Sequence, residues 1–499
     1  MEPFWNRPLS DRQLLTFMLA ALFFHIIPFL MADVSYIDDH WISQYAHGSW
    51  LEQGRPLIKP IYQGLTFTAG APNLFPLPLL IAITSMAFAM TRLVRHYFST
   101  PSLLHALVPL PLFYNPFFLQ NLSYQYDGPA MILSMATILY ALTFTNSSAL
   151  IKVLVPGLMI AIALSLYQPS LNVFLGLFCI ELVRCLEQKK SCPATLKCLV
   201  TGWLQPGVGL VIYLVSVSVF INSGRDQFLP LNSHWGPEMI ERLFFFSEKI
   251  SLLFTTGSLS FGIPLLILAL LGYGQILSAS WKTAVGHSDK TWVATLGLLL
   301  PFALLLVIPG FSLLLKDFNP QARVLMGFST LGVALFYLVH SVKTNRHYPF
   351  GLILIAPLVF MTSLSYAYGR VLVLQKELST QVLYSLTYDL ETQPRLKQIS
   401  RFHFNGSPFE NWLPAAEGTF RWMPVIKYIL NANYLVMPQM LPRAGVTQIG
   451  LFTTKAPDLD KGFGAPLVDR RFYSIHVRDE EAYIVMKKIA EPEHYPWKQ

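Results

Sequence analysis

The stretch QLLTFMLAALFFHIIPFLMA at residues 13–32 and the stretch DVSYIDDHW that follows it at residues 33–41 decide the fold of this chain. The first stretch holds no Asp, Glu, Lys or Arg, and its length of about twenty residues is that of an apolar helix that crosses a bilayer. The second stretch turns polar and acidic at once. Together they predict a membrane-spanning helix that opens directly into an acidic loop at the membrane surface.

The same length criterion identifies further apolar stretches along the whole chain. Hydrophobic residues make up 53% of the 499 residues and charged residues only 13%, whereas soluble domains are about a quarter charged. An ordinary soluble enzyme is thereby excluded. A cleaved signal peptide is disfavoured because its apolar run would be shorter. We predict an all-α polytopic membrane bundle with about eleven spans, near residues 13–32, 73–91, 102–120, 128–145, 152–168, 170–187, 200–221, 250–275, 292–315, 323–341 and 349–368.

The distribution of Lys and Arg predicts how the bundle is oriented. With the N-terminus in the cytoplasm, the cytoplasmic loops hold roughly twice as many of these residues as the outside loops, in line with the positive-inside rule. An odd number of spans then places the C-terminus outside. Residues 1–368 are expected to form the membrane domain, with residues 33–72 as the first outside loop. Residues 369–499 are expected to form a small α/β domain outside.

The C-terminal segment contains short stretches of alternating polar and apolar residues. They lie at residues 398–404, 471–477 and 482–486 and predict strands. Residues 422–430 are more helical, and the last span is expected to continue as a helix through Asp389. The cysteines fall at or near the predicted cytoplasmic face and are expected to be free thiols, and they are Cys179, Cys185, Cys192 and Cys198.

The first outside loop carries two adjacent aspartates, Asp38 and Asp39. After them, aromatic and aliphatic residues recur at helical spacing until Gly54, which predicts an amphipathic helix in the headgroup zone. One interpretation is that an aspartate caps this helix. The other is that one carboxylate is a general base and its neighbour orients it or a metal ion, since adjacent acids raise one another's pKa. The two interpretations are compatible. Arg55 and Lys59 follow directly.

Two more outside turns carry polar and aromatic residues. Asp127 follows Tyr124 and Tyr126 at the start of a predicted helix, where it either caps that helix or belongs to a site. The two tyrosines are either interfacial anchors or substrate contacts. Tyr167 and Gln168 form a tight reversal, whose polar groups must face protein, water or a ligand because lipid would leave them unsatisfied.

Two arginines lie on the same predicted side. Arg323 follows the segment Lys316–Gln321, and Arg370 ends the last predicted span. A guanidinium at a membrane surface suits two-point binding of a phosphate. The alternative is that each arginine snorkels to the interface or is ion-paired, for instance Arg323 with Asp317.

The predicted spans carry few ionisable groups, chiefly His25 and His105, which we interpret as packing residues. Coupled transporters usually carry such groups at mid-bilayer. The sequence also holds no glycine-rich phosphate loop, His-Glu-x-x-His motif or Gly-x-Ser-x-Gly motif. An ATP-driven pump is therefore disfavoured.

An outside catalytic face has no ATP or nucleotide sugar to draw on, so its activated donors are lipid-linked phosphates. Glycosyl transfer from such a donor needs a carboxylate that takes the acceptor proton and cations that bind the departing phosphate. The pair Asp38 and Asp39, together with Arg323 and either Lys59 or Arg370, matches these requirements.

The chain also carries an ordered set of short motifs, all on the predicted outside face and spread over most of the membrane part. They are Tyr36-Ile-Asp38-Asp39, Gly54-Arg55-Pro56-Leu57, Asn121-Leu-Ser-Tyr124-Gln-Tyr126-Asp127, Tyr167-Gln168 and Pro320-Gln-Ala-Arg323. In this order they resemble those of the serotype-converting glucosyltransferases of bacteria and their phages, which belong to the GT-C superfamily of membrane glycosyltransferases.

The resemblance implies a GT-C-like enzyme of the bacterial inner membrane with its active site and C-terminal domain in the periplasm. Such an enzyme takes a hexose, in this family glucose, from an undecaprenyl-phosphate-sugar and attaches it to the O-antigen of lipopolysaccharide. The catalytic acids would be Asp38, Asp39 and Asp127. The donor phosphate would be bound by Arg323, Lys59, Arg55 and Arg370, and the substrates by Tyr124, Tyr126, Tyr167 and Gln168.

A divalent cation, Mg²⁺ or Mn²⁺, would be the cofactor if the reaction needs one, and no nucleic-acid partner is expected. Two other functions stay open at this point. One is a flippase or transporter of a lipid-linked sugar, and the other is a GT-C enzyme whose acceptor is lipid A or a protein.

Overall fold

The computed structural model describes residues 4–218, 227–284, 286–343, 350–405, 412–431, 436–449, 465–478, 480–487 and 489. The first spanning helix, α1 (Asp11–Ala32), begins at a capping box: the Ser10 hydroxyl accepts from the N–H of Gln13, and the Gln13 side chain accepts from the N–H of Ser10. It ends at Asp33, which has a left-handed backbone. The chain therefore leaves the helix where the sequence turns acidic.

Eight helices in the described part of the chain are long and apolar enough to cross a membrane. They are α1, α4 (Leu77–Tyr97), α9 (Ala149–Leu166), α11 (Cys192–Val217), α13 (Thr256–Thr283), α14 (His287–Val307), η4 (Ala322–Gly327) continued by α15 (Phe328–His340), and η5 (Phe350–Leu354) continued by α16 (Ile355–Thr392). The predicted polytopic helical bundle is confirmed.

Three of the eleven predicted spans are shorter or more charged than the rest. The prediction at 102–120 is broken into α5 (Leu103–Leu107), α6 (Pro111–Tyr114), η2 (Pro116–Phe118) and α7 (Leu119–Ser123). Prolines in this segment remove backbone donors and interrupt a continuous helix. The other two are α8 (Asp127–Leu142), which is short, and α10 (Ser170–Glu187), which carries Glu181, Arg184 and Glu187.

The helices form an inner and an outer set. α8 packs against α4, α9 and α10, and α1 packs against α4 and α16. α11, α13 and α14 cover the outside, and exposed apolar side chains such as Trp203 and Leu298 give them a lipid-compatible surface. α9 and α11 approach closely through glycine, since a Cβ added at Gly209 would lie 2.8 Å from the carbonyl oxygen of Gly157.

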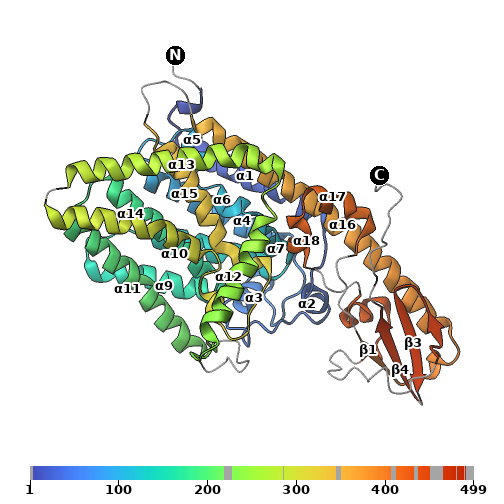
Figure 1. Ribbon diagram of the computed structural model, residues 1–499. Helices are drawn as coiled ribbons and strands as arrows, with labels where there is room; N and C mark the ends of the chain where they lie inside the picture. Colours follow the sequence, from blue (N-terminus) through green and yellow to red (C-terminus); the bar gives the residue numbers. More distant parts are fainter. Residues whose placement is uncertain are drawn as a thin grey trace.

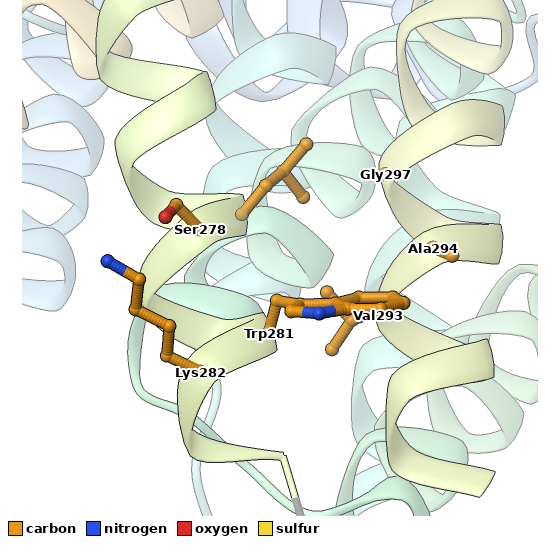
Figure 2. Close-up of a pocket in the computed structure, with 7 residues that line it drawn as sticks. Ser278, Trp281, Lys282, Val293, Ala294 and Gly297 are labelled. Carbon is orange, nitrogen blue, oxygen red and sulfur yellow. The ribbon is translucent and has the colours of Figure 1, made fainter. Parts of the chain in front are cut away.

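A cavity of about 330 Å³ lies between α13 and α14 (Figure 2). The indole of Trp281 lies beside Val293 within it, whereas the Lys282 side chain points away from α14. The helices thus face each other with apolar groups there. No convergence of polar groups marks this cavity as a reaction site.

The C-terminal segment begins as the continuation of α16 beyond the bundle to a small sheet (Figure 1). The strand order is β1-β4-β3-β2, with β1 (Arg401–Asn405) parallel to β4 (Glu481–Met486) and the other pairs antiparallel. β2 is Val468–Asp469 and β3 is Tyr473–Arg478. The predicted α/β character and the helical continuation through Asp389 are confirmed. The first strand starts three residues later than predicted because Leu396–Gln398 form a 3₁₀ turn.

The C-terminal segment contributes to two cores. The end of α16 and the sheet form one, with Leu386 and Ile484 fully buried in it. α17 (Glu417–Trp422) and α18 (Val425–Leu430) instead join the core of the bundle. The helix predicted at residues 422–430 is divided between them, since Pro424 lacks a backbone donor. α18 lies on the end of the bundle that carries residues 33–72, since the Tyr36 hydroxyl donates to the carbonyl oxygen of Leu430.

All four cysteines are free thiols.

Candidate active site

The first loop after α1 is less helical than its pattern predicts. α2 (Asp39–Tyr45) ends at Ala46, which has a left-handed backbone, and the next helix, α3 (Ile58–Thr66), starts twelve residues later. The cause is Trp50, which turns inward and stacks on Tyr62 with ring centroids 5.7 Å apart instead of extending a surface helix. Gly54 adopts the expected positive φ, at 71°. The loop is thus folded against one end of the bundle.

Asp39 joins this loop to the segment that precedes α8. Its Oδ2 accepts hydrogen bonds from the backbone N–H of Tyr36 at 2.9 Å and of Gln125 at 2.8 Å, and its Oδ1 accepts from the N–H of Tyr126 at 3.2 Å. Burial raises the pKa of Asp39 to about 8, and the backbone hydrogen bonds oppose that rise by stabilising the carboxylate. Because only 1% of the Asp39 surface is exposed, its role is to hold the loop in position.

Asp38 has a different environment. It is only partly buried, stands at the N-cap of α2 and makes no capping hydrogen bond. Its charge acts on both Tyr124 and Arg323. The residue before it, Ile37, has φ 45°, a left-handed conformation that costs a β-branched residue about 1–3 kcal/mol. The surrounding contacts therefore hold a strained turn directly before Asp38.

Asp127 lies at the first turn of α8 and is fully engaged. Its Oδ1 accepts from the indole N–H of Trp50 at 2.6 Å, and its Oδ2 accepts from Nη1 of Arg55 at 3.1 Å. The Asp127 side chain is 5% exposed and the Arg55 side chain 12%. Asp127 is therefore an ion-pair partner that anchors the first loop on α8, and its side chain makes no capping bond.

Arg323 lies at the start of the span formed by η4 and α15, beside Tyr124 and Tyr167. Its Nη1 donates to the Tyr124 hydroxyl at 2.8 Å, and its carbonyl oxygen accepts from the Tyr167 hydroxyl at 3.1 Å. Its backbone N–H donates to the Gln120 side chain at 2.7 Å. Burial raises the pKa of the Tyr124 hydroxyl and the charge of Arg323 opposes this, so a neutral hydroxyl holds the guanidinium in place.

Tyr167 brings the two arginines of the site together. The Arg55 guanidinium lies over its ring, 5.0 Å from the centroid, while its hydroxyl bonds to the backbone of Arg323. Nε of Arg55 is buried and has no hydrogen-bond partner among the described residues. The charges of both arginines thus act on the Tyr167 hydroxyl, and Arg55 retains an unused donor.

Gln168 holds the turn before Arg55. Its side-chain amide donates to the carbonyl oxygens of Gln53 at 3.0 Å and Gly54 at 3.1 Å. The Tyr213 hydroxyl, from α11, donates to the Gly54 carbonyl at 3.0 Å. The polar groups of this tight reversal therefore face protein, and they position the arginine rather than a ligand directly.

The remaining candidates lie around this centre or away from it. Tyr126 is buried in the ring cluster with Trp50 and Tyr62, and its hydroxyl has no partner within the described part of the chain. Lys59 is partly exposed on α3, and Arg370 is exposed on α16. Among the described residues, neither has a hydrogen bond, ion pair or ring contact with another candidate. The structure thus gathers the other nine and leaves these two outside the network.

Several residues of the network are not predicted by the sequence. The spacing predicts Trp50 on a surface helix, while Gln120, Gln125 and Tyr213 lack any local pattern that marks them. Gln125 contacts Asp39 through its backbone N–H, and the residue type at a position does not predict such a contact. The Asn121-to-Asp127 motif was the available hint, because it contains several polar residues in a segment that is buried.

The donor set does not suit a divalent cation. Both oxygens of Asp39 and both of Asp127 already accept from N–H groups, whereas Mg²⁺ requires free oxygen ligands in near-octahedral geometry. In the described ranges, no cluster of three or more His, Cys, Asp or Glu is placed to hold a metal ion. The chemistry available is that of a carboxylate beside two guanidinium groups at one end of a helical bundle.

Comparison with known proteins identifies the family of the chain. The sequence model of the family described as glucosyl transferase GtrII matches residues 27–334, which contain every candidate except Arg370. A similar curated protein is the uncharacterized 55.3 kDa protein in the gtrB 5' region of Salmonella phage P22. It is 28% identical over 165 residues, which are 33% of this chain and 34% of that relative. The match thus spans about a third of either protein.

No solved structure matches the chain. Because the family match covers more than half of the sequence and the entire described site network, the chain belongs to the GtrII glucosyl transferase family.

Proposed function

We propose that this protein is a membrane hexosyltransferase that transfers glucose from undecaprenyl-phosphate-glucose to the O-antigen of lipopolysaccharide. The observation that carries the proposal is the placement of Arg55 and Arg323 around Tyr167. The Arg55 guanidinium lies over the Tyr167 ring, the charges of both arginines act on the Tyr167 hydroxyl, and Asp38 acts electrostatically on Arg323. Such cations can bind a phosphate, and such a carboxylate can take the proton of an acceptor hydroxyl.

The proposed location is the periplasmic face of the bacterial inner membrane. Support comes from the Lys and Arg distribution in the sequence, which favours a cytoplasmic N-terminus. The first loop, the segment before α8, the turn at Tyr167 and Arg323 are hydrogen-bonded to one another. If one of them lies outside, all of them do.

In the proposed reaction, Asp38 is the general base. A base must first reach the acceptor hydroxyl, and only then does its pKa matter. Asp38 is partly exposed, whereas Asp39 is buried and its oxygens are already occupied by backbone donors. Asp38 takes the proton of the acceptor hydroxyl as the acceptor oxygen bonds to the anomeric carbon. Asp39 is a positioning residue that holds the strained turn before Asp38.

Arg323 and Arg55 act on the leaving group. The bond between the anomeric carbon and the phosphate oxygen breaks with both electrons going to the phosphate, and the sugar passes through an oxocarbenium-like state. The guanidinium groups bind the charge that develops on the departing undecaprenyl phosphate. Because the acceptor oxygen displaces the phosphate in a single step, with one carboxylate as base, the product has the anomeric configuration opposite to that of the donor.

Reconstituted protein tests this proposal. Proteoliposomes that contain undecaprenyl-phosphate-[¹⁴C]glucose are mixed with delipidated O-polysaccharide, and label in the polysaccharide is measured for wild type, Asp38→Asn and the control Asp317→Asn. Asp317 is an exposed acid near Arg323 in sequence. We expect transfer by wild type and by the control, and loss of transfer by Asp38→Asn.

Transfer that survives Asp38→Asn unchanged would remove the proposed base. Label that only changes leaflet, without joining the polysaccharide, would identify a flippase instead. Label that joins lipid A or protein in a whole-membrane assay, but not polysaccharide, would replace the acceptor while keeping the mechanism.

A further inference from the structure

A polar cavity lies beside the network described above and shares Tyr36 and Gln125 with it. It has a volume of about 510 Å³, within the ~300–1,000 Å³ typical of small-molecule sites. Three parts of the chain enclose it: the first loop from Asp33 to His40, the stretch of α16 from Gln375 to Tyr384, and the tail segments around Asn431 and Met437–Ala444. In Figure 1, α2 lies between the bundle and the sheet, which is where these parts meet.

The cavity is lined by an ordered row of amide and carboxylate groups. Oδ1 of Asp33 accepts from the Gln125 side chain at 2.9 Å, and the Gln125 side-chain oxygen accepts from Asn73 at 3.0 Å. The side-chain oxygen of Gln321, which also lines the cavity, is buried without a partner among the described residues. An unpartnered buried oxygen beside a fixed row of amides is a site for a hydroxyl donor.

The charged groups of the lining favour a neutral or weakly anionic ligand. Lys376 donates to the backbone oxygen of Asp33 at 2.7 Å, and Arg443 lies 3.1 Å from Nδ1 of His40. Burial and the charge of Arg443 lower the pKa of His40 to about 4, so His40 is neutral near pH 7. Two cations then face the single carboxylate of Asp33 in a lining otherwise made of amides, hydroxyls, one exposed tyrosine and some apolar side chains.

The position of the cavity decides which substrate it suits. The part of α16 that lines it, from Gln375 onward, lies beyond the last predicted apolar span at residues 349–368, and the tail closes the other side. A lipid-linked donor must present its phosphate from the bilayer, near Arg323. A polar wall made by extramembrane segments instead suits a water-soluble chain of sugars, whose hydroxyls pair with amides and whose C–H faces cover a tyrosine ring.

The cavity also borders the segment that carries the proposed base. Its lining includes Tyr36 and Ile37 on one side of the aspartate pair and His40 on the other. Gln125, which lines the cavity with its side chain, holds Asp39 with its backbone N–H. A saccharide in the cavity would therefore lie against the residues on both sides of the aspartate pair.

We propose that this cavity is the acceptor-saccharide site and that the C-terminal segment, through residues 437–444, helps to select the acceptor. The assignment rests on the proposed function and adds to it the place where the acceptor binds. The exposed ring of Tyr384 provides the stacking surface, and the amide row of Asn73, Gln125 and Gln321 provides the hydroxyl contacts.

Two pairs of matched variants of the full-length protein test this assignment. Tyr384 and Tyr388 are both exposed on α16, at 67% and 65%, but only Tyr384 lines the cavity. Tyr384→Ala should raise the KM for delipidated O-polysaccharide roughly tenfold, the change that follows from losing one good contact, and Tyr388→Ala should leave it unchanged. Likewise Thr380→Trp should fill the cavity, whereas Trp at the exposed neighbour Gln381 should not.

Slow hydrolysis of undecaprenyl-phosphate-glucose without acceptor is measured for the same variants. We expect the cavity variants to hydrolyse the donor at the wild-type rate, with the donor KM unchanged, while transfer to the polysaccharide falls. An unchanged acceptor KM in both Tyr384→Ala and Thr380→Trp would overturn the acceptor site, even if Asp38-dependent transfer continues. A raised donor KM in these variants would overturn it as well, because the cavity would then hold the donor sugar.

If the wild type neither hydrolyses the donor nor transfers its sugar, the proposed function is wrong. A binding measurement then tests the acceptor site by itself. Saturation-transfer NMR with the same polysaccharide should show contact in the wild type and Tyr388→Ala but not in Thr380→Trp. Equal signals in all three would overturn the acceptor site independently of activity.

Discussion

The backbone N–H of Gln125 donates a 2.8 Å hydrogen bond to the carboxylate of Asp39, which joins the loop after α1 to the segment before α8. Two residues 86 positions apart in sequence are thus fixed against each other at one end of the bundle. Because Asp39 accepts two more N–H groups, one buried carboxylate sets the geometry of both segments. This contact separates the roles of the two adjacent aspartates.

Asp39→Asn is expected to destabilise the protein. The amide has one oxygen and one NH₂ group, so at least one backbone donor of Tyr36, Gln125 or Tyr126 loses its acceptor and faces another donor. Leaving a buried donor unsatisfied costs about 1–3 kcal/mol. Thermal unfolding in detergent at pH ~9, above the pKa of Asp39, followed by intrinsic fluorescence, should show a lower Tm. An unchanged Tm would mean that the loop does not depend on this carboxylate.

Asp38→Asn is expected to have the opposite profile. Removing a general base lowers kcat by about 10²–10⁴-fold, while the change from carboxylate to amide in this partly exposed side chain removes no capping bond. Transfer should be lost, while the Tm should stay within experimental error of the wild-type Tm. The proposed division of roles fails if Asp38→Asn unfolds as readily as Asp39→Asn or keeps its activity.

The sequence predicted much of this site because sidedness is a strong constraint. Once the first loop is assigned to one end of the bundle, Asp127, Tyr167 and Arg323 must lie at that end too, since the spans between them fix the side on which each turn falls. The hydrogen bonds among these segments follow from that placement. The bundle itself follows from the length of the apolar runs.

The details that the sequence did not predict depend on tertiary contacts. Trp50 fits a surface helix by spacing, but its indole N–H reaches Asp127, and the burial of a large ring outweighs a weak local helix preference. Asp39 is held by backbone N–H groups. Nearly every residue has such a group, so the sequence cannot predict this contact. The position of α18 on the bundle is also invisible locally, because its apolar face could have packed equally well on the sheet.

Arg323→Lys is expected to impair transfer although it keeps the charge. The guanidinium is fixed by the Tyr124 hydroxyl and lies 5.4 Å from the centre of that ring. Lysine is a point charge and cannot bind a phosphate at two points. We expect a loss of roughly 10²–10³-fold in kcat/KM for the donor. Lys316→Ala, which removes an exposed cation from the same loop, should be close to wild type, and an equal loss there would indicate a general effect of charge.

His40 is expected to make stability depend on pH. Burial and Arg443 lower its pKa to about 4 in the folded protein, whereas the unfolded chain takes up a proton near pH ~6.5. The contribution of neutral His40 to the free energy of unfolding is therefore fully present above pH ~6.5 and is lost as the pH falls toward about 4. The loss is on the order of 1–2 kcal/mol at pH ~5. His40→Asn keeps an acceptor for Arg443 but does not titrate, so its Tm should fall less over the same range. Parallel curves for the two proteins would contradict this assignment.

The ion pair of Arg55 and Asp127 allows a double-mutant test of the loop's anchor. Arg55→Ala leaves the carboxylate of Asp127, 5% exposed, beside only the Trp50 indole, and removing one partner of a buried pair costs about 3–5 kcal/mol. Asp127→Asn removes that uncompensated charge, so the double variant should be more stable than Arg55→Ala alone. Additive losses in the cycle would show that the two side chains do not stabilise each other. Because Arg55 also flanks Tyr167, the double variant should regain stability without regaining transfer, which separates the anchoring of the loop from the binding of phosphate.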